Sequence, residues 1–229
     1  MPALVTSYEQ GYGWRNAPVG CELSRILREQ GLVIVSWIWQ AGGVASRGDP
    51  IITPEDARGL KVRGGSREMD MLLQNAGATV VNMPSNEIYN ALRSGALDAA
   101  LTSSTSLISF RLQETARSLT TARAGSYWFM FEPLLMSRTV FERLTKAQQQ
   151  AVMTVGADLE KFAMNSARMD DAEVATVYRG VGARVVDLNP DALRGWQEVA
   201  RNTAWKDFAA RNSNCAKLMA LAEQSIAAI

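Results

Sequence analysis

The sequence contains no histidine. Histidine is the commonest general base and the commonest transition-metal ligand in proteins, so its absence excludes Ser-His-Asp and Cys-His sites. The only two cysteines, Cys21 and Cys215, lack the spacing of a metal site. We therefore predict neither a metal site nor a cofactor. The two cysteines are interpreted as small apolar side chains, although the sequence leaves open whether they pair.

The sequence also lacks an excess of charge of either sign and has no long apolar run. The 24 basic and 23 acidic residues give a net charge of +1, and no basic block stands out, which argues against nucleic acid as a partner. No apolar run approaches the roughly 18 residues of a membrane span, so no direct membrane insertion is expected. Residues 1–4 lack a basic region followed by an apolar core, and no secretory signal is therefore visible.

The 229 residues, 47% of them hydrophobic, suffice for one large or two small domains. Short apolar segments alternate with helical periodicity between residues 53 and 102, which predicts an α/β lobe with a mostly parallel sheet. The strands are expected at 60–63, 79–83 and 98–102, and the helices at 67–75 and 86–93. A glycine-rich loop is expected at 41–48, after a strand at 32–39.

The second half of the chain predicts one long strand and one long helix. The strand, at residues 127–137, is expected to cross the molecule. Thr145 and Gln148 form a capping box that opens a helix of roughly 30 residues. Three acidic residues of this helix are interpreted as a solvated face rather than a cation site: Asp170, Asp171 and Glu173.

Several motifs stand in a fixed order along the whole chain. They are Ile-Thr-Pro-Glu-Asp at 52–56, Gly-Leu-Lys-Val-Arg at 59–63, Glu-Ile-Tyr-Asn-Ala-Leu at 87–92 and Gly-Ala-Leu-Asp at 95–98, followed by Phe-Glu-Arg-Leu at 141–144 and the long helix. In this order they resemble the solute-binding proteins of TRAP transporters. The resemblance implies a two-lobed α/β fold of the periplasmic-binding-protein kind, with crossing strands and one long spanning helix, that binds a ligand without catalysis.

The same resemblance implies how the chain divides and what it meets. Lobe I would comprise residues 1–40 and 128–168, and lobe II residues 41–127 and 169–229. Family members usually open with further strand and helix elements, so lobe I is expected to be incomplete at its N-terminus. The implied partners are a small carboxylate and the integral membrane subunits of a TRAP system, and the implied location is the periplasm.

Arg63 is the first candidate for a ligand contact, because in the family the arginine that ends this strand holds the ligand's carboxylate. A guanidinium presents a planar fork of donors that matches two carboxylate oxygens. The family often has an acidic residue, asparagine and proline after the strand that ends near Asp98. Here residues 101–103 are Leu-Thr-Ser instead, which indicates a different ligand.

Six further residues are candidates for the pocket. Ser66, after two glycines, and Ser85 can contact ligand or cap a helix, and capping is the favoured interpretation for Ser85. Thr102 and Ser103 follow a strand at the edge where open α/β sheets place ligands. Two aromatic residues at the start of the crossing strand are expected to wall the pocket: Tyr127 and Trp128.

Two alternatives remain open from the sequence. One is a truncated or cytoplasmic ligand-sensing remnant without a transport role. The other is a histidine-free hydrolase in which Lys61 activates Ser103.

Overall fold

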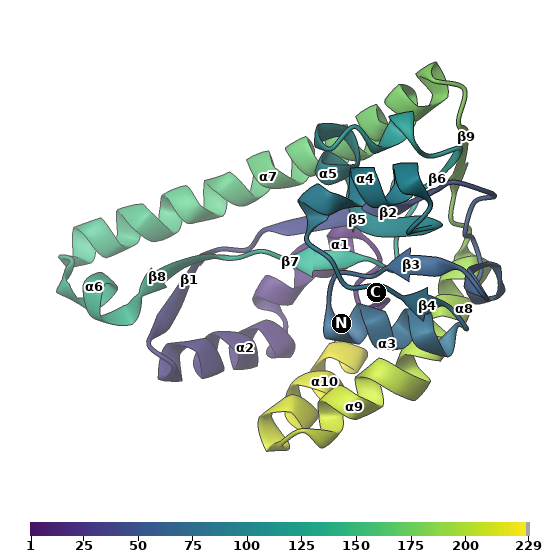
Figure 1. Ribbon diagram of the computed structural model, residues 1–229. Coiled ribbons are helices and arrows are strands. Elements are labelled where there is room, and N and C mark those ends of the chain that lie inside the picture. Colours follow the sequence, from purple (N-terminus) through teal and green to yellow (C-terminus); the bar gives the residue numbers. More distant parts are fainter. Residues whose placement is uncertain (228–229) are drawn as a thin grey trace.

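The computed structural model describes residues 1–227 and shows a sheet-containing body with a narrow arm (Figure 1). The body is built on a seven-stranded sheet with the order β4-β3-β5-β2-β6-β9, and β7 also pairs with β2. The arm contains a second sheet of two strands, β1 and β8. The strands are β1 (Leu32–Ser36), β2 (Trp39–Ser46), β3 (Lys61–Arg63), β4 (Thr79–Val80), β5 (Ala99–Ser103), β6 (Ser118–Thr121), β7 (Phe129–Phe131), β8 (Leu134–Ser137) and β9 (Arg184–Asp187).

Helices surround this sheet, and α7 extends from the arm to the body along the top of Figure 1. The α-helices are α1 (Tyr8–Gly13), α2 (Pro18–Glu29), α3 (Arg67–Asn75), α4 (Ile88–Ser94), α5 (Ser104–Ser109), α6 (Arg138–Arg143), α7 (Lys146–Gly180), α8 (Pro190–Ala200), α9 (Lys206–Ala210) and α10 (Ser213–Ala227). The predicted capping box is confirmed, since Thr145 Oγ1 accepts from the Gln148 N–H and Gln148 Oε1 accepts from the Thr145 N–H. The helix that it opens has 35 residues.

Two predictions are wrong at the centre of the sheet: the glycine-rich loop and the mostly parallel pairing of the strands. Residues 41–48 were expected to form a loop, but most of them belong to β2, which runs antiparallel to β5 and β6 and makes the sheet mixed. A Cβ at Gly42 would lie 2.2 Å from the carbonyl oxygen of Thr102, and one at Gly43 would lie 2.3 Å from that of Thr120. These glycines therefore serve close strand packing rather than chain flexibility.

The expected crossing strand at residues 127–137 is interrupted. β7 ends at Phe131 and β8 begins at Leu134, with Pro133 between them. Proline lacks the N–H that continues a strand's hydrogen bonding, which accounts for the break. The two strands pair with different partners, β7 with β2 in the body and β8 with β1 in the arm. The segment still crosses the molecule, but as two strands joined by a bend.

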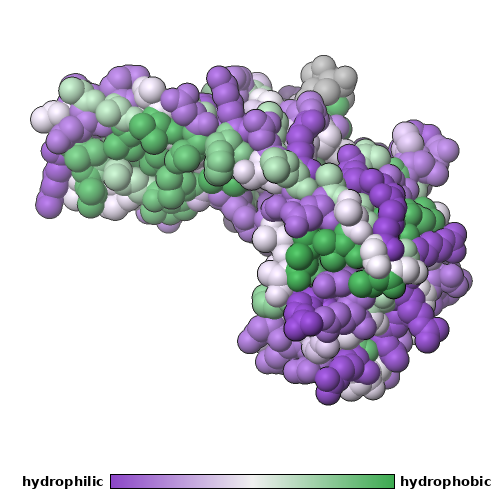
Figure 2. Space-filling view, turned by 90° about the horizontal axis from the view of Figure 1, so that it is seen from above, coloured by the Kyte–Doolittle hydropathy of each residue, from purple (hydrophilic) through white to green (hydrophobic). Residues whose placement is uncertain are grey.

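The arm consists of α2, β1, β8, α6 and the first part of α7. α7 packs directly on β1, because a Cβ at Gly156 would lie 2.1 Å from the carbonyl oxygen of Val35. Part of the arm's surface is apolar and exposed, and Figure 2 shows hydrophobic surface extending along the arm. The exposed large apolar side chains of β8, α6 and α7 are Leu134, Leu135, Val140, Val155, Leu159, Phe162 and Met169.

Cys21 and Cys215 are both free, and Cys21 is exposed, so the interpretation of the two cysteines as small apolar fillers is wrong for Cys21. Within residues 1–227, none of the helices has the length and apolar character that a bilayer crossing requires.

Candidate ligand-binding site

Arg63 ends β3 and is held by three hydrogen bonds. Its Nε donates to the carbonyl of Met83 at 3.3 Å, Nη1 to the carbonyl of Leu101 at 3.0 Å and Nη2 to Ser85 Oγ at 3.1 Å. A guanidinium has five N–H groups, so one on each terminal nitrogen has no acceptor among residues 1–227. The two terminal nitrogens thus each keep one donor, and a guanidinium uses such donors to bind the two oxygens of a carboxylate.

The turn after Arg63 is shaped around its guanidinium. Gly65 has φ +92°, and a Cβ there would lie 2.6 Å from Arg63 Nη1. A Cβ at Gly64 would lie 2.3 Å from Oδ1 of Asp70. Burial lowers the pKa of Arg63, an effect that the nearby Asp70 carboxylate opposes. Burial likewise raises the pKa of Asp70, against the opposing charge of Arg63.

Ser85 corrects an interpretation from the sequence. Capping was favoured, but Ser85 is the first residue of a 3₁₀ turn, η3 (Ser85–Glu87), and its side chain caps no helix. Its Oγ instead accepts from Arg63 Nη2. Ser85 therefore orients the guanidinium.

Thr102 and Trp128 both pack closely against Gly42. Thr102 lies in β5 opposite Gly43 and is 3% exposed. A Cβ at Gly42 would lie 2.2 Å from the Thr102 carbonyl oxygen and 2.5 Å from the Trp128 ring. Leu101, whose carbonyl binds Arg63, directly precedes Thr102. The structure therefore brings Arg63, Ser85, Thr102 and Trp128 to one end of β3 and β5.

The remaining predicted residues have other roles in the structure. Ser66 Oγ accepts from the Met69 N–H and caps α3, and Ser103 Oγ accepts from the Ser106 N–H and caps α5. Both stay beside the site, and Ser66 remains exposed. Tyr127 is 1% exposed, and its ring stacks on Trp196 of α8 at 4.3 Å. The structure thus places Tyr127 in the core rather than on a pocket wall.

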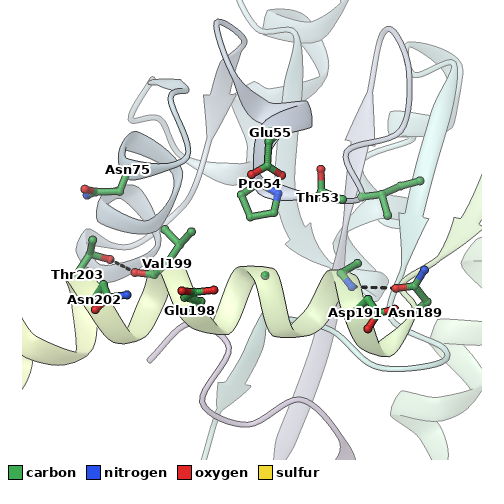
Figure 3. Close-up of a pocket in the computed structure, with 13 residues that line it drawn as sticks. Thr53, Pro54, Glu55, Asn75, Asn189, Asp191, Glu198, Val199, Asn202 and Thr203 are labelled. Carbon is green, nitrogen blue, oxygen red and sulfur yellow. Dashed lines mark hydrogen bonds between the residues drawn. The ribbon is translucent and has the colours of Figure 1, made fainter.

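Two hollows differ in charge. One of about 900 Å³ is lined by Arg63, Arg67, the Gly65–Ser66 turn and Asp70, among others. The other, of about 640 Å³, lies between α8 and the 3₁₀ turn η2 (Pro54–Ala57) and contains no lysine or arginine (Figure 3). It has three carboxylates instead: Glu55, Asp191 and Glu198. An anion is attracted to the first hollow and repelled by the second.

The structure does not support the hydrolase alternative. The Lys61 N–H donates to Asp98 Oδ2 at 2.8 Å, so Lys61 lies just before β5 starts. Ser103 ends the same strand. Five residues of strand separate the two by roughly 16 Å, too far for a direct proton transfer.

Asp171 is the polar residue that the sequence interpretation missed. It was expected on a solvated face, but it is 3% exposed and accepts hydrogen bonds from Tyr8 Oη at 2.9 Å and Ser104 Oγ at 2.5 Å. Helical spacing contains the signal, because Asp171 lies four residues after Ala167 and three before Val174, both buried. Its burial raises its pKa, and the hydrogen bonds from Ser104 and Tyr8 act in the opposite direction.

This geometry defines a class of protein, the two-lobed α/β binding proteins with an arginine at the end of a strand. Residues 1–212 match the bacterial extracellular solute-binding protein family 7, DctP, and the chain belongs to that family. It is 62% identical to a solute-binding protein of Albidiferax ferrireducens over 99% of this chain and 67% of the relative. A second relative, a solute-binding protein of Chromohalobacter salexigens, is 26% identical over 70% of this chain. The match covers 48% of that relative's length.

Solved structures confirm the fold. A TRAP periplasmic solute-binding protein from Rhodoferax ferrireducens, with bound malonate, superposes with a TM-score of 0.92 at 62% identity, covering 99% of this chain and 72% of that one. One from Sulfitobacter sp. NAS-14.1, with bound β-D-galacturonate, gives 0.83 at 23% identity, covering 98% and 73%. The second likeness concerns the fold alone. Both relatives are longer than this chain.

Proposed function

We propose that the chain is the solute-binding component of a TRAP transporter and captures a small carboxylate at Arg63. The observation that carries the proposal is the Arg63 guanidinium, which is fixed by three acceptors and keeps one free N–H on each terminal nitrogen. The 62% identical structure holds malonate, a small dicarboxylate, which makes it the natural first probe.

Binding in this proposal is completed by lobe closure. Lobe I comprises residues 1–40 and 128–168, and lobe II residues 41–127 and 169–229. Ligand contacts present only in the closed state shift the population toward closure, and no reaction is catalysed. The binding protein acts in the periplasm, where its closed form is recognised by the integral membrane subunits of the transporter.

The test is the thermal melting of the chain with and without malonate. A ligand at a hundred times its Kd adds about 2.7 kcal/mol to the free energy of unfolding. For a chain of this size that raises Tm by about 5–10 °C. Arg63→Ala should abolish the shift, whereas Arg67→Ala, which removes an exposed arginine of the same hollow, should largely keep it. Equal shifts in wild type and Arg63→Ala would refute the role of Arg63.

A further inference from the structure

A buried hydrogen-bonded node joins three segments of the chain around Asp171. Tyr8 Oη of α1 donates to Asp171 Oδ2 of α7, and the same hydroxyl accepts from the Ala41 N–H of β2 at 3.3 Å. Ser104 Oγ, at the start of α5, donates to Asp171 Oδ1. Tyr8, Ser104 and Asp171 are 5%, 1% and 3% exposed.

The carboxylate in this node has no ion-pair partner among residues 1–227. Arg168, whose positive charge acts on Asp171, is itself paired with Glu9. A buried carboxylate without a cation is costly, and two hydroxyl donors offset only part of that cost. Such a group near a binding site is a candidate for a functional role.

One end of the node lies beside the ligand-binding residues. Ser104 directly follows Thr102 and Ser103, and Ser103 caps α5 through its bond to the Ser106 N–H at 3.2 Å. α5 is therefore attached directly to the end of β5 that carries the hydroxyl groups of Thr102 and Ser103.

The other end lies among the segments that connect body and arm. The residues just before Tyr8 pair with the start of the crossing segment, since the Ser126 N–H donates to the Thr6 carbonyl at 3.1 Å. The Tyr8 ring meets Phe129 of β7 edge-on at 5.1 Å. Tyr8 is therefore in direct contact with the segment that crosses from the body to the arm.

We propose that Asp171 is a positioning residue that couples the connecting segments to the ligand-binding end of β5, through Tyr8 on one side and Ser104 on the other. Its role is to hold α5, and with it Thr102 and Ser103, in a fixed position relative to these connecting segments. This inference rests on the proposed function for its consequence, because the coupled end is the carboxylate site.

Asp171→Asn separates this role from a purely structural one. The amide has the same shape, and its NH₂ group can donate to a hydroxyl, so packing is retained while the buried charge is removed. The fold should therefore lose no stability. Only one of the two hydroxyls, Tyr8 or Ser104, then donates to residue 171, while the other accepts from the NH₂ group, so two bonds to a charged acceptor become weaker neutral bonds and the coupling is weakened.

The experiment measures two quantities in the full chain: the rate of amide hydrogen exchange at Ser106 and the melting temperature. We expect Asp171→Asn to accelerate exchange about tenfold, the equivalent of one hydrogen bond to a charged group, without lowering Tm. Tyr8→Phe should give a similar acceleration, although the substituted position lies in a different segment from Ser106. Glu173→Gln, on the exposed side of α7, is the matched control and should change neither quantity.

The outcomes separate this inference from the proposed function. Unchanged Ser106 exchange in Asp171→Asn or in Tyr8→Phe overturns the coupling, as does a large fall in Tm with Asp171→Asn, which indicates a structural role. Malonate titration supplies the second reading, with about tenfold weaker binding expected for Asp171→Asn. If wild-type protein fails to bind malonate, that result counts against the proposed function, and Ser106 exchange still decides the coupling.

Discussion

Replacing Gly65 by alanine tests whether the turn after β3 exists to seat Arg63. Gly59 offers a matched control, because both glycines have positive φ, +92° and +76°. Alanine at either position incurs the left-handed backbone cost of about 1–2 kcal/mol. The difference lies in what the new Cβ meets: Arg63 Nη1 at 2.6 Å from position 65, and nothing within 4 Å of position 59.

The contact at position 65 forces the guanidinium to move. The displaced group loses its hydrogen bond to the buried carbonyl of Leu101, which is left unsatisfied at a cost of about 1–3 kcal/mol. Gly65→Ala should therefore lower the free energy of unfolding by roughly that amount more than Gly59→Ala does. The carboxylate loses its aligned fork at the same time, which predicts malonate binding weakened by at least about tenfold.

Chemical denaturation and calorimetric titration with malonate measure the two effects on the same samples. Gly59→Ala should be destabilised but bind malonate as wild type does. If Gly65→Ala binds malonate with wild-type affinity, the Arg63 fork seen here is not the carboxylate contact. If the two variants unfold alike, the guanidinium is not held as its hydrogen bonds indicate.

Three further predictions concern other parts of the molecule. Ser85→Ala should weaken malonate binding a few-fold, because Arg63 Nη2 loses an acceptor, while circular dichroism shows α4 unchanged, since Ser85 caps no helix. Phe162→Ser should reduce binding of a hydrophobic fluorescent dye without lowering Tm, because Phe162 is 69% exposed; a marked fall in Tm would contradict this. Hydrogen bonds from Arg25 and Lys217 lower the pKa of Glu22 from 4.5 to about 2, so its contribution to stability is present above pH 4.5 and lost as the pH falls toward 2; denaturation of Glu22→Gln should show a weaker loss across that window.

Local signals in the sequence located most elements correctly. The helix expected at 67–75 coincides with α3, and Thr145 with Gln148 fixed the start of α7. These signals work because a cap or a helical stripe involves neighbours in the chain. Arg63 was different, since its importance came from the family resemblance and its geometry came from Met83, Ser85 and Leu101, which are distant in sequence.

The errors have a common physical cause, which is contact between segments that are remote in the sequence. Gly42 and Gly43 resemble loop residues because they carry no side chain, yet their strand occupies the sheet centre for that reason. Asp171 resembles a solvated acid because its donors, Tyr8 and Ser104, are 163 and 67 residues away.

The glycine-containing strand β2 and the buried Asp171 are connected by hydrogen bonds. β2 passes between the halves of the sheet, and its Ala41 N–H donates to the Tyr8 hydroxyl that in turn donates to Asp171. One residue further, Gly42 brings the strand against Thr102 and Trp128. A strand held this closely on both sides transmits a displacement rather than absorbing it, because packed interiors deform little. The segment that was expected to be a loop is therefore a tightly packed link between Tyr8 and the end of β5.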